Sequence, residues 1–390
     1  MPTMTSRQRL LAAIRFEGPD RVPVCPRMWR YMLAHGGSQQ LPAYLKYAAE
    51  YGVDLMIGCS AGPVVMYPDP GSDCTGLGPG FRVEESVAED NEGRTVSRIL
   101  HTPAGRLSDR TRIPRPGGQF GIAPNNHIEE YLLKGPDDLP ALRTLVSAWT
   151  TAAPGGDFPA VRRQLGEQGL VMANTYSAMS HNAGDVYSLD RLMMDCMERQ
   201  AFVEELMDVF HRPLMEATRR ALESGAEMVY CSTFFESMSA GWSPRLYREL
   251  FLPRIRAHVE LTHQYGALYH LYDDGKVAGT LPMWRETGVD LVSTLCPPPA
   301  GDVTLAEARR LAGDDLCLNG GIDTVNTVWR GTPATIEAAI RAAIQDAAGA
   351  EGGYILGTSD SITEETPPEN FRAFFEAGNR LGARAALTRK

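Results

Sequence analysis

The sequence predicts an α/β protein with a (β/α)8 TIM barrel and a small antiparallel β insertion after the second strand. Eight short apolar runs alternate with helical stretches, and most of these runs end in a polar residue. The chain has 390 residues, against about 250 for a barrel core, so it has room for an insertion. The eight runs are 22–27, 54–60, 170–176, 227–234, 267–272, 290–295, 315–319 and 353–357. We therefore expect a single barrel domain over 1–390, with its active site at the C-terminal ends of the strands.

Helix start signals support the alternation. Thr5 or Ser6 can cap a first helix, and Ser243-Pro244 and Thr332-Pro333 each place a capping hydroxyl before a proline at the first helical position. Further helices are expected at 41–51, 199–224, 332–350 and 368–381. These helices fall between the predicted strands, as a barrel requires.

The stretch 61–118 interrupts this rhythm. It begins rich in glycine and proline and then forms three alternating segments, 80–87, 94–101 and 105–112, separated by turn sequences. We interpret it as an inserted antiparallel meander. It either roofs the active site or is a solvated decoration, and the sequence favours neither.

Composition indicates a globular protein in the cytoplasm. The formal charge of −10 argues against nucleic acid as the main partner. No apolar run approaches the ~20 residues of a membrane span, and the first residues form an amphipathic pattern rather than a signal peptide. The seven cysteines are scattered without a C-x-x-C pair, which is typical of buried thiols in a reducing compartment. The sequence leaves open whether the protein forms a homodimer.

The densest group of chemically useful residues follows the fifth predicted strand. His270 and Tyr272 alternate onto one face there, and Asp274 follows at the turn. A histidine with carboxylates suits a divalent metal ion as well as an acid–base pair. Glu236 follows the fourth strand, where partial burial would raise the pKa of its carboxyl group. For each residue a structural role at the barrel rim is the alternative.

Six residues past other strand ends are candidates for substrate binding. They are Arg27 and Trp29 after the first strand, Tyr176 and His181 after the third, and Asn319 and Asp323 around the end of the seventh. Arginine at a strand end is a natural partner for a carboxylate. The sequence lacks a G-x-S-x-G, a Walker loop, an early G-x-G-x-x-G and an H-E-x-x-H motif, which excludes several common enzyme classes.

Several short motifs in order resemble the uroporphyrinogen decarboxylase superfamily. They are TSRQR at 5–9, PDRVPV at 19–24, WSP at 242–244, FLP at 251–253, His270 with Asp274-Gly275, GGID at 320–323 and ETPPEN at 365–370. The superfamily includes true decarboxylases and corrinoid-linked methyltransferases. The position where a decarboxylase carries its catalytic aspartate is Ala61 here, and the arginine motif near the first strand matches poorly. The resemblance therefore favours the methyltransferase branch.

In that branch, thiol-activating members bind zinc through H-x-C and a later cysteine. This chain has His270-Leu271-Tyr272 and, near the later position, Asp360. The resemblance then implies zinc or another divalent ion held by His270, Glu236 and Asp360, which suits activation of an oxygen rather than a sulfur.

The function that the resemblance implies is demethylation of a small methoxylated or methylated substrate. The methyl acceptor would be a corrinoid on a separate protein, because the chain has no D-x-H-x-x-G motif. A second hypothesis is a metal-independent lyase or hydrolase in which Arg27 binds a substrate carboxylate and His270 pairs with Asp274. A third is a non-catalytic binding protein.

Overall fold

The computed structural model describes residues 3–63, 65–117, 124–152, 155–349 and 351–383. The chain divides into two compact units. The first comprises Met1–Cys59, Asp157–Asn174 and Ala221–Lys390, and the second comprises Ser60–Gly156 and Thr175–Arg220. Among the described residues, no helix is both long and apolar enough to cross a membrane. The seven cysteines are free thiols.

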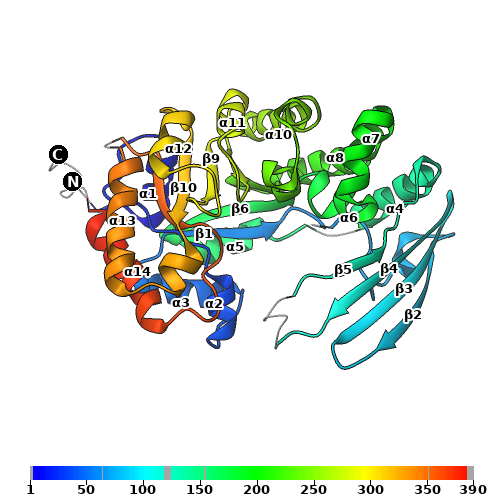
Figure 1. Cartoon of the computed structure of the whole chain (residues 1–390), viewed down its shortest axis with the longest axis horizontal. Coiled ribbons are helices and arrows are strands. Elements are labelled where there is room, and N and C mark those ends of the chain that lie inside the picture. Colours follow the sequence, from blue (N-terminus) through cyan, green and yellow to red (C-terminus); the bar gives the residue numbers. More distant parts are fainter. Residues whose placement is uncertain (1–2, 64, 118–123, 153–154, 350, 384–390) are drawn as a thin grey trace. The chain divides into compact units, whose positions relative to one another are not determined.

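A seven-stranded sheet in the order β1-β6-β7-β8-β9-β10-β11 forms the centre of the fold (Figure 1). The strands are β1 (Leu55–Ser60), β6 (Gly169–Tyr176), β7 (Met228–Ser232), β8 (Leu268–Tyr272), β9 (Leu291–Leu295), β10 (Cys317–Ile322) and β11 (Tyr354–Thr358). The pairs from β7 to β11 are parallel. Seven of the eight predicted strands are therefore confirmed, and the fold resembles a TIM barrel.

The first predicted strand, 22–27, is not a strand. Val24 makes an isolated parallel bridge to Leu356 of β11, and its carbonyl accepts a 2.9 Å hydrogen bond from the N–H of Asp54, just before β1. The segment thus bonds to both edges of the sheet. Pro23 and Pro26 have no N–H to donate, so a regular ladder cannot extend in either direction.

Helices follow most of the strands in the first unit. They are α1 (Ser6–Ile14), α2 (Trp29–Ala34), α3 (Leu41–Tyr51), α5 (Phe158–Leu165), α9 (Pro244–Leu246), α10 (Leu252–Gln264), α11 (Leu281–Thr287), α12 (Leu305–Ala312), α13 (Pro333–Ala347) and α14 (Pro368–Leu381). Thr5 caps α1 and Thr332 caps α13, each in a capping box. Ser243 caps α9. The predicted start signals are confirmed.

The hydrophobic core places α1 against the N-terminal ends of the strands. Leu10, Ala13 and Ile14 pack with a ring of residues that begin six strands. The ring includes Leu170, Met228, Leu268, Leu291, Cys317 and Ile355. Since α1 covers this end, the opposite, C-terminal ends of the strands are left for a site.

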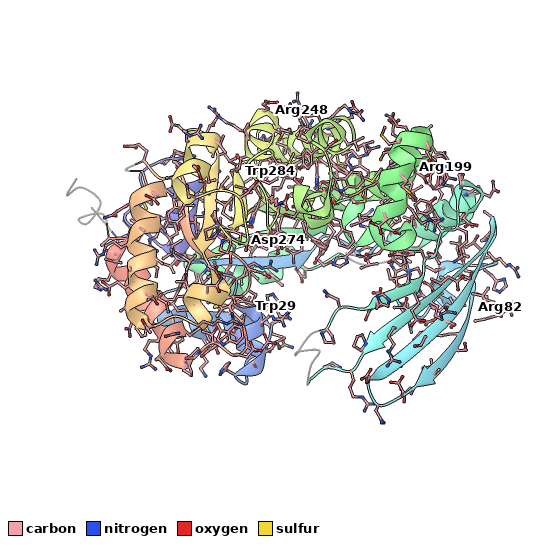
Figure 2. All side chains as sticks on the ribbon, viewed as in Figure 1. Trp29, Arg82, Arg199, Arg248, Asp274 and Trp284 are labelled. Atoms are coloured by element: carbon pink, nitrogen blue, oxygen red, sulfur yellow. The ribbon has the colours of Figure 1, made fainter. Side chains whose placement is uncertain are left out.

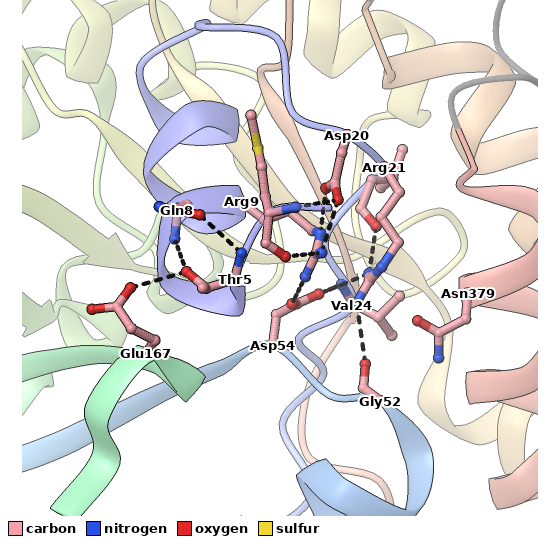
Figure 3. A network of polar contacts seen from close by, with 12 residues as sticks. Thr5, Gln8, Arg9, Asp20, Arg21, Val24, Gly52, Asp54, Glu167 and Asn379 are labelled. Atoms are coloured by element: carbon pink, nitrogen blue, oxygen red, sulfur yellow. Dashed lines mark hydrogen bonds and ion pairs between the residues drawn. The ribbon is translucent and has the colours of Figure 1, made fainter. Parts of the chain in front are cut away.

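A buried ionic network fixes α1 to the start of β1 (Figure 3). Arg9 bonds Asp20 at 2.6 Å and Asp54 at 2.7 Å, and Arg21 lies 2.8 Å from the other oxygen of Asp54. The same carboxylate accepts the N–H of Val24 at 2.9 Å. Asp54 is fully buried, so all of its charge is neutralised by these donors. The network thereby holds the bridging segment in place.

The second unit contains the inserted sheet. Its antiparallel order is β2-β3-β4-β5, with β2 (Arg82–Glu89), β3 (Gly93–Thr102), β4 (Gly105–Pro114) and β5 (His127–Glu130). The helices α4 (Leu139–Ala152), α6 (Gly184–Tyr187), α7 (Leu189–Glu198) and α8 (Gln200–Glu223) complete it. The predicted antiparallel insertion is confirmed, and β5 is a fourth strand that the sequence analysis missed. The predicted end of the insertion, 118, lies outside the described residues, and the assignment of 1–390 to one domain stays a prediction.

Candidate active site

His270 lies in β8, whose five residues are all buried. The side chain is 3% exposed, and neither ring nitrogen has a hydrogen-bond partner among the residues that the structure describes. The ring of Tyr230, its neighbour in β7, meets it edge-on with centroids 5.0 Å apart. Burial, followed by the nearby charge of Arg27, lowers the pKa of His270 to about 3. The imidazole is therefore neutral at pH 7, with a free lone pair.

Arg27 supplies the positive charge next to His270. Its guanidinium carbon lies 4.5 Å from the centre of the Tyr272 ring, and its Nη1 donates to Asp360 Oδ1 at 3.2 Å. Burial alone would lower the pKa of Arg27, but Tyr230, Tyr272 and Asp360 together raise it above the ordinary value. The site therefore keeps one permanent cation stacked on an aromatic face.

Asp274 is paired with Tyr272 rather than with His270. The hydroxyl of Tyr272 donates to Asp274 Oδ2 at 3.0 Å. Burial is the main cause that raises the pKa of Asp274, Asp360 raises it further, and Tyr272 and Arg27 oppose them. The structure thus brings three of the predicted residues and Arg27 into one area, but it does not form the predicted His270–Asp274 pair. Asp274 is labelled in Figure 2.

Three hydroxyl groups hold the turn that carries Asp274. Thr233 donates to the carbonyl of Tyr272 at 2.9 Å, Thr294 to that of Asp273 at 2.8 Å, and Ser237 to that of Asp274 at 3.0 Å. Thr294 has φ of +65°, which is strained for a β-branched residue. The sequence analysis missed these hydroxyls, because a side chain that bonds a distant backbone leaves no local motif.

Glu236 lies in a buried acidic cluster with Asp273. Glu236 is 3% exposed and Asp273 is fully buried. Burial, followed by Asp274 and Glu236, raises the pKa of Asp273 well above its usual range. Burial is the main cause that raises the pKa of Tyr247 and of Tyr269, and Glu236 adds to the rise in both. Since side chains alternate between the two faces of a strand, Tyr269 and Asp273 fall on the face opposite to His270, Tyr272 and Asp274. Glu236 therefore acts on that opposite face.

The predicted metal set does not fit a metal ion in this structure. No group of three His, Cys, Asp or Glu side chains in the described parts of the chain is arranged to hold one. The side chain of Asp360 is 56% exposed and is paired with Arg27. A guanidinium beside His270 also repels a divalent cation.

Asn319, Asp323 and Trp29 have partners of other kinds. The amide of Asn319 donates to the carbonyls of Cys25 and Ile355, both at 3.2 Å. Asp323 caps the following helical turn by accepting from the N–H groups of residues 325 and 326 at 2.8 Å. Trp29 lies 5.5 Å from the guanidinium carbon of Arg30. Their predicted contact with substrate stays a prediction.

Tyr176 and His181 belong to the second compact unit. Their rings lie 4.9 Å apart in an edge-on arrangement, and His181 Nδ1 is 3.0 Å from Asp185 Oδ2. The backbone of His181 has φ of +56° inside a kinked helical turn. A place for them in the substrate site also stays a prediction.

The comparisons with known proteins agree with the motifs. The uroporphyrinogen decarboxylase (URO-D) family model matches residues 161–381, which is more than half of the chain. The chain belongs to the URO-D family. A uroporphyrinogen decarboxylase of Trichodesmium erythraeum is 31% identical over 200 residues, covering 49% of this chain and 52% of the relative. That of Crocosphaera subtropica is 25% identical over 95% of both chains.

A solved structure of a methyltransferase from Methanosarcina mazei has the same fold. It superposes with a TM-score of 0.59 over 97% of this chain and 99% of its own, at 17% sequence identity. Members of the URO-D family are enzymes by name, and membership of this family supports enzymatic activity for the chain. The match to the first relative spans about half of its length, so that relative's activity does not transfer as a whole.

Proposed function

We propose that this chain is a methyltransferase-like enzyme of the URO-D superfamily that demethylates a small methoxylated carboxylic acid. The methyl group passes to a corrinoid carried by a separate protein. The observation that carries this proposal is the juxtaposition of a permanent cation, Arg27, with a buried neutral histidine, His270, and with Asp274, whose carboxyl group accepts the hydroxyl of Tyr272.

Arg27 is the group that binds the substrate. A guanidinium is suited to two parallel hydrogen bonds to a carboxylate. An arginine-bound carboxylate is stabilised as an anion, which opposes its departure as carbon dioxide. The reacting bond is therefore elsewhere in the substrate, and the carboxylate serves as an anchor.

Asp274 is the proton donor in this proposal. When the O–CH₃ bond breaks, its electron pair stays on the oxygen, which needs a proton to leave as a hydroxyl group. The acceptor, a cobalt(I) corrinoid, contributes the electron pair of the new carbon–cobalt bond. Burial raises the pKa of the Asp274 carboxyl group, which favours it as a proton donor, and the N–H of the neutral His270 donates a hydrogen bond to the ether oxygen of the substrate.

Ala61 argues against the activity of the named relatives. The family resemblance places the decarboxylase's catalytic carboxylate at this position, and the side chain here is a buried methyl group. Without that carboxylate, a cationic pyrrole intermediate would lack its stabilising charge. The reaction we propose forms no such cation.

A second candidate function is a metal-independent lyase or hydrolase acting on a carboxylated substrate. The two ring nitrogens of His270, which lack a hydrogen-bond partner among the described residues, favour it, because they can hydrogen-bond a substrate group directly. The two functions differ in the fate of the methyl group, which makes them separable.

The test uses a panel of methoxylated carboxylic acids with free cob(I)alamin as the methyl acceptor. Methylcobalamin formation is followed by absorbance in the presence of a chelator. We expect turnover by the wild type. Arg27→Gln should lower kcat/KM at least tenfold, because it removes a charge-assisted hydrogen bond worth about 1.5–3 kcal/mol. Asp274→Asn should lower kcat. Glu364→Gln, which breaks the neighbouring Arg30–Glu364 pair, is the matched control and should not change the rate. Substrate consumption without methylcobalamin would instead support the lyase or hydrolase, and activity abolished by chelator would reject the metal-free site.

A further inference from the structure

The pair Arg27–Asp360 differs from a structural salt bridge. The side chains are 34% and 56% exposed, and one contact, Nη1 to Oδ1 at 3.2 Å, joins them. Charge-assisted hydrogen bonds of this kind are typically about 2.7–2.9 Å long. By contrast, Arg30 meets both oxygens of Glu364, at 2.9 and 3.0 Å. Arg27 is therefore held by a weak, single-contact partner.

Arg27 also interacts with Tyr272, whose ring centre lies 4.5 Å from the guanidinium carbon and whose hydroxyl shares a hydrogen bond with it. Its bond to Asp360 uses Nη1 alone, and a guanidinium has five N–H donors. A substrate carboxylate can offer two parallel acceptors, whereas Asp360 offers one at long distance. Replacing the single hydrogen bond from Arg27 to Asp360 by two hydrogen bonds from Arg27 to the substrate carboxylate is therefore favourable.

We propose that Asp360 is a resident counter-ion that the substrate carboxylate displaces from Arg27, and that the site selects aryl monocarboxylates. This inference rests on the proposed function for its use of Arg27 as the anchor. It adds the substrate class and a specificity-determining residue, Asp360.

The aromatic rings and the acidic side chains around Arg27 indicate the substrate class. Tyr230 lies 5.8 Å from Tyr272 and 5.0 Å from His270, centroid to centroid, so the area around Arg27 is lined by rings that suit an aryl body. Asp274 and Asp360 both act on this area electrostatically. A second substrate carboxylate would face these acids, and Arg30, which also interacts with Asp360, is already paired with both oxygens of Glu364, which disfavours dicarboxylates.

Binding of simple probes to the full chain tests the inference. Benzoate, phthalate, benzamide and acetate are titrated by calorimetry into the wild type, Asp360→Asn, Arg27→Gln and the control Glu364→Gln. We expect benzoate to bind more tightly than the other three. Asp360→Asn should bind benzoate about two- to five-fold more tightly, the range for loss of a competing exposed ion pair, and Glu364→Gln should match the wild type.

The outcomes separate this inference from the proposed function. Unchanged or weaker benzoate binding in Asp360→Asn, with binding lost in Arg27→Gln, would overturn the counter-ion role while leaving Arg27 as the anchor. Equal affinity for phthalate or acetate would overturn the substrate class. Unchanged benzoate binding in Arg27→Gln would reject the anchor itself, and with it the proposed function. Circular dichroism of each variant confirms that a loss of binding is not a loss of folding.

Discussion

Replacing His270 with phenylalanine should stabilise the protein at pH 7 while abolishing its activity. The two ring nitrogens are buried without a hydrogen-bond partner in the described structure, and a buried unsatisfied polar group costs about 1–3 kcal/mol. Phenylalanine has a similar ring volume and keeps the edge-on contact with Tyr230. We therefore expect His270→Phe to raise the free energy of unfolding by about 1–2 kcal/mol, as measured by denaturant titration.

The same variant should flatten the dependence of stability on pH. The pKa of His270 is lowered to about 3 in the folded protein, against about 6.5 when unfolded. Above pH 6.5 both states are neutral, so this residue costs no protonation energy. As the pH falls below 6.5, His270 binds a proton in the unfolded state but stays neutral in the folded state. The free energy of unfolding therefore falls by about 1.4 kcal/mol per pH unit until pH 3.

Comparison of unfolding free energies at pH 7 and pH 5 isolates this effect. The wild type should lose about 2 kcal/mol more than His270→Phe over that interval. His263 is a control of opposite sign, because its hydrogen bond to Asp290 is the main cause that raises its pKa. Its stabilising contribution is complete below the unfolded pKa and is lost as pH rises through the folded pKa. Equal slopes for wild type and His270→Phe would refute the neutral, buried histidine.

Three further predictions follow from individual contacts. Asp54→Asn removes the carboxylate that pairs with Arg21 and one of the two carboxylates that pair with the buried Arg9, so it should destabilise the protein by about 3–5 kcal/mol in denaturant titration. Thr332→Ala removes a helix cap and should cost about 1 kcal/mol, whereas Thr332→Ser should restore it. Asp360→Asn removes a charge that adds to the burial that raises the pKa of Asp274, so the fall in rate with rising pH should begin at a lower pH in its pH–rate profile; an unshifted profile would reject Asp274 as the proton donor.

The barrel-like fold was predictable because its signals are local. Apolar runs of strand length, helix caps and the turn-rich insertion each occur within a few residues of sequence. The prediction of a strand at 22–27 was wrong for a reason that is also local in sequence. Pro23 and Pro26 lack the backbone N–H groups that a regular strand would donate, although the segment is apolar. The fourth strand of the insertion, His127–Glu130, is short and carries little alternation, so its partner strand specifies it more than its own residues do.

The candidate site was predictable only in its location. Strand-end position identified Arg27, His270, Tyr272 and Asp274, and the structure gathers them. Their pairing was not predictable, because the hydrogen bond of Asp274 to Tyr272 and the ion pair of Arg27 with Asp360 depend on side-chain directions. The described residues contain no group of three His, Cys, Asp or Glu side chains arranged for a metal ion, and no spacing in the sequence encodes such an arrangement.

The fate of a doubly labelled substrate tests the central claim most directly. A methoxybenzoate carrying ¹³C in both the carboxylate and the methoxy group is incubated with chelated enzyme and cob(I)alamin, and the carbon signals are followed by NMR. The proposed function predicts that the methoxy carbon appears as methylcobalamin while the carboxylate carbon stays on the ring, and that Arg27→Gln abolishes this transfer. Release of the carboxylate carbon as carbon dioxide, with the methoxy carbon retained, would contradict the account.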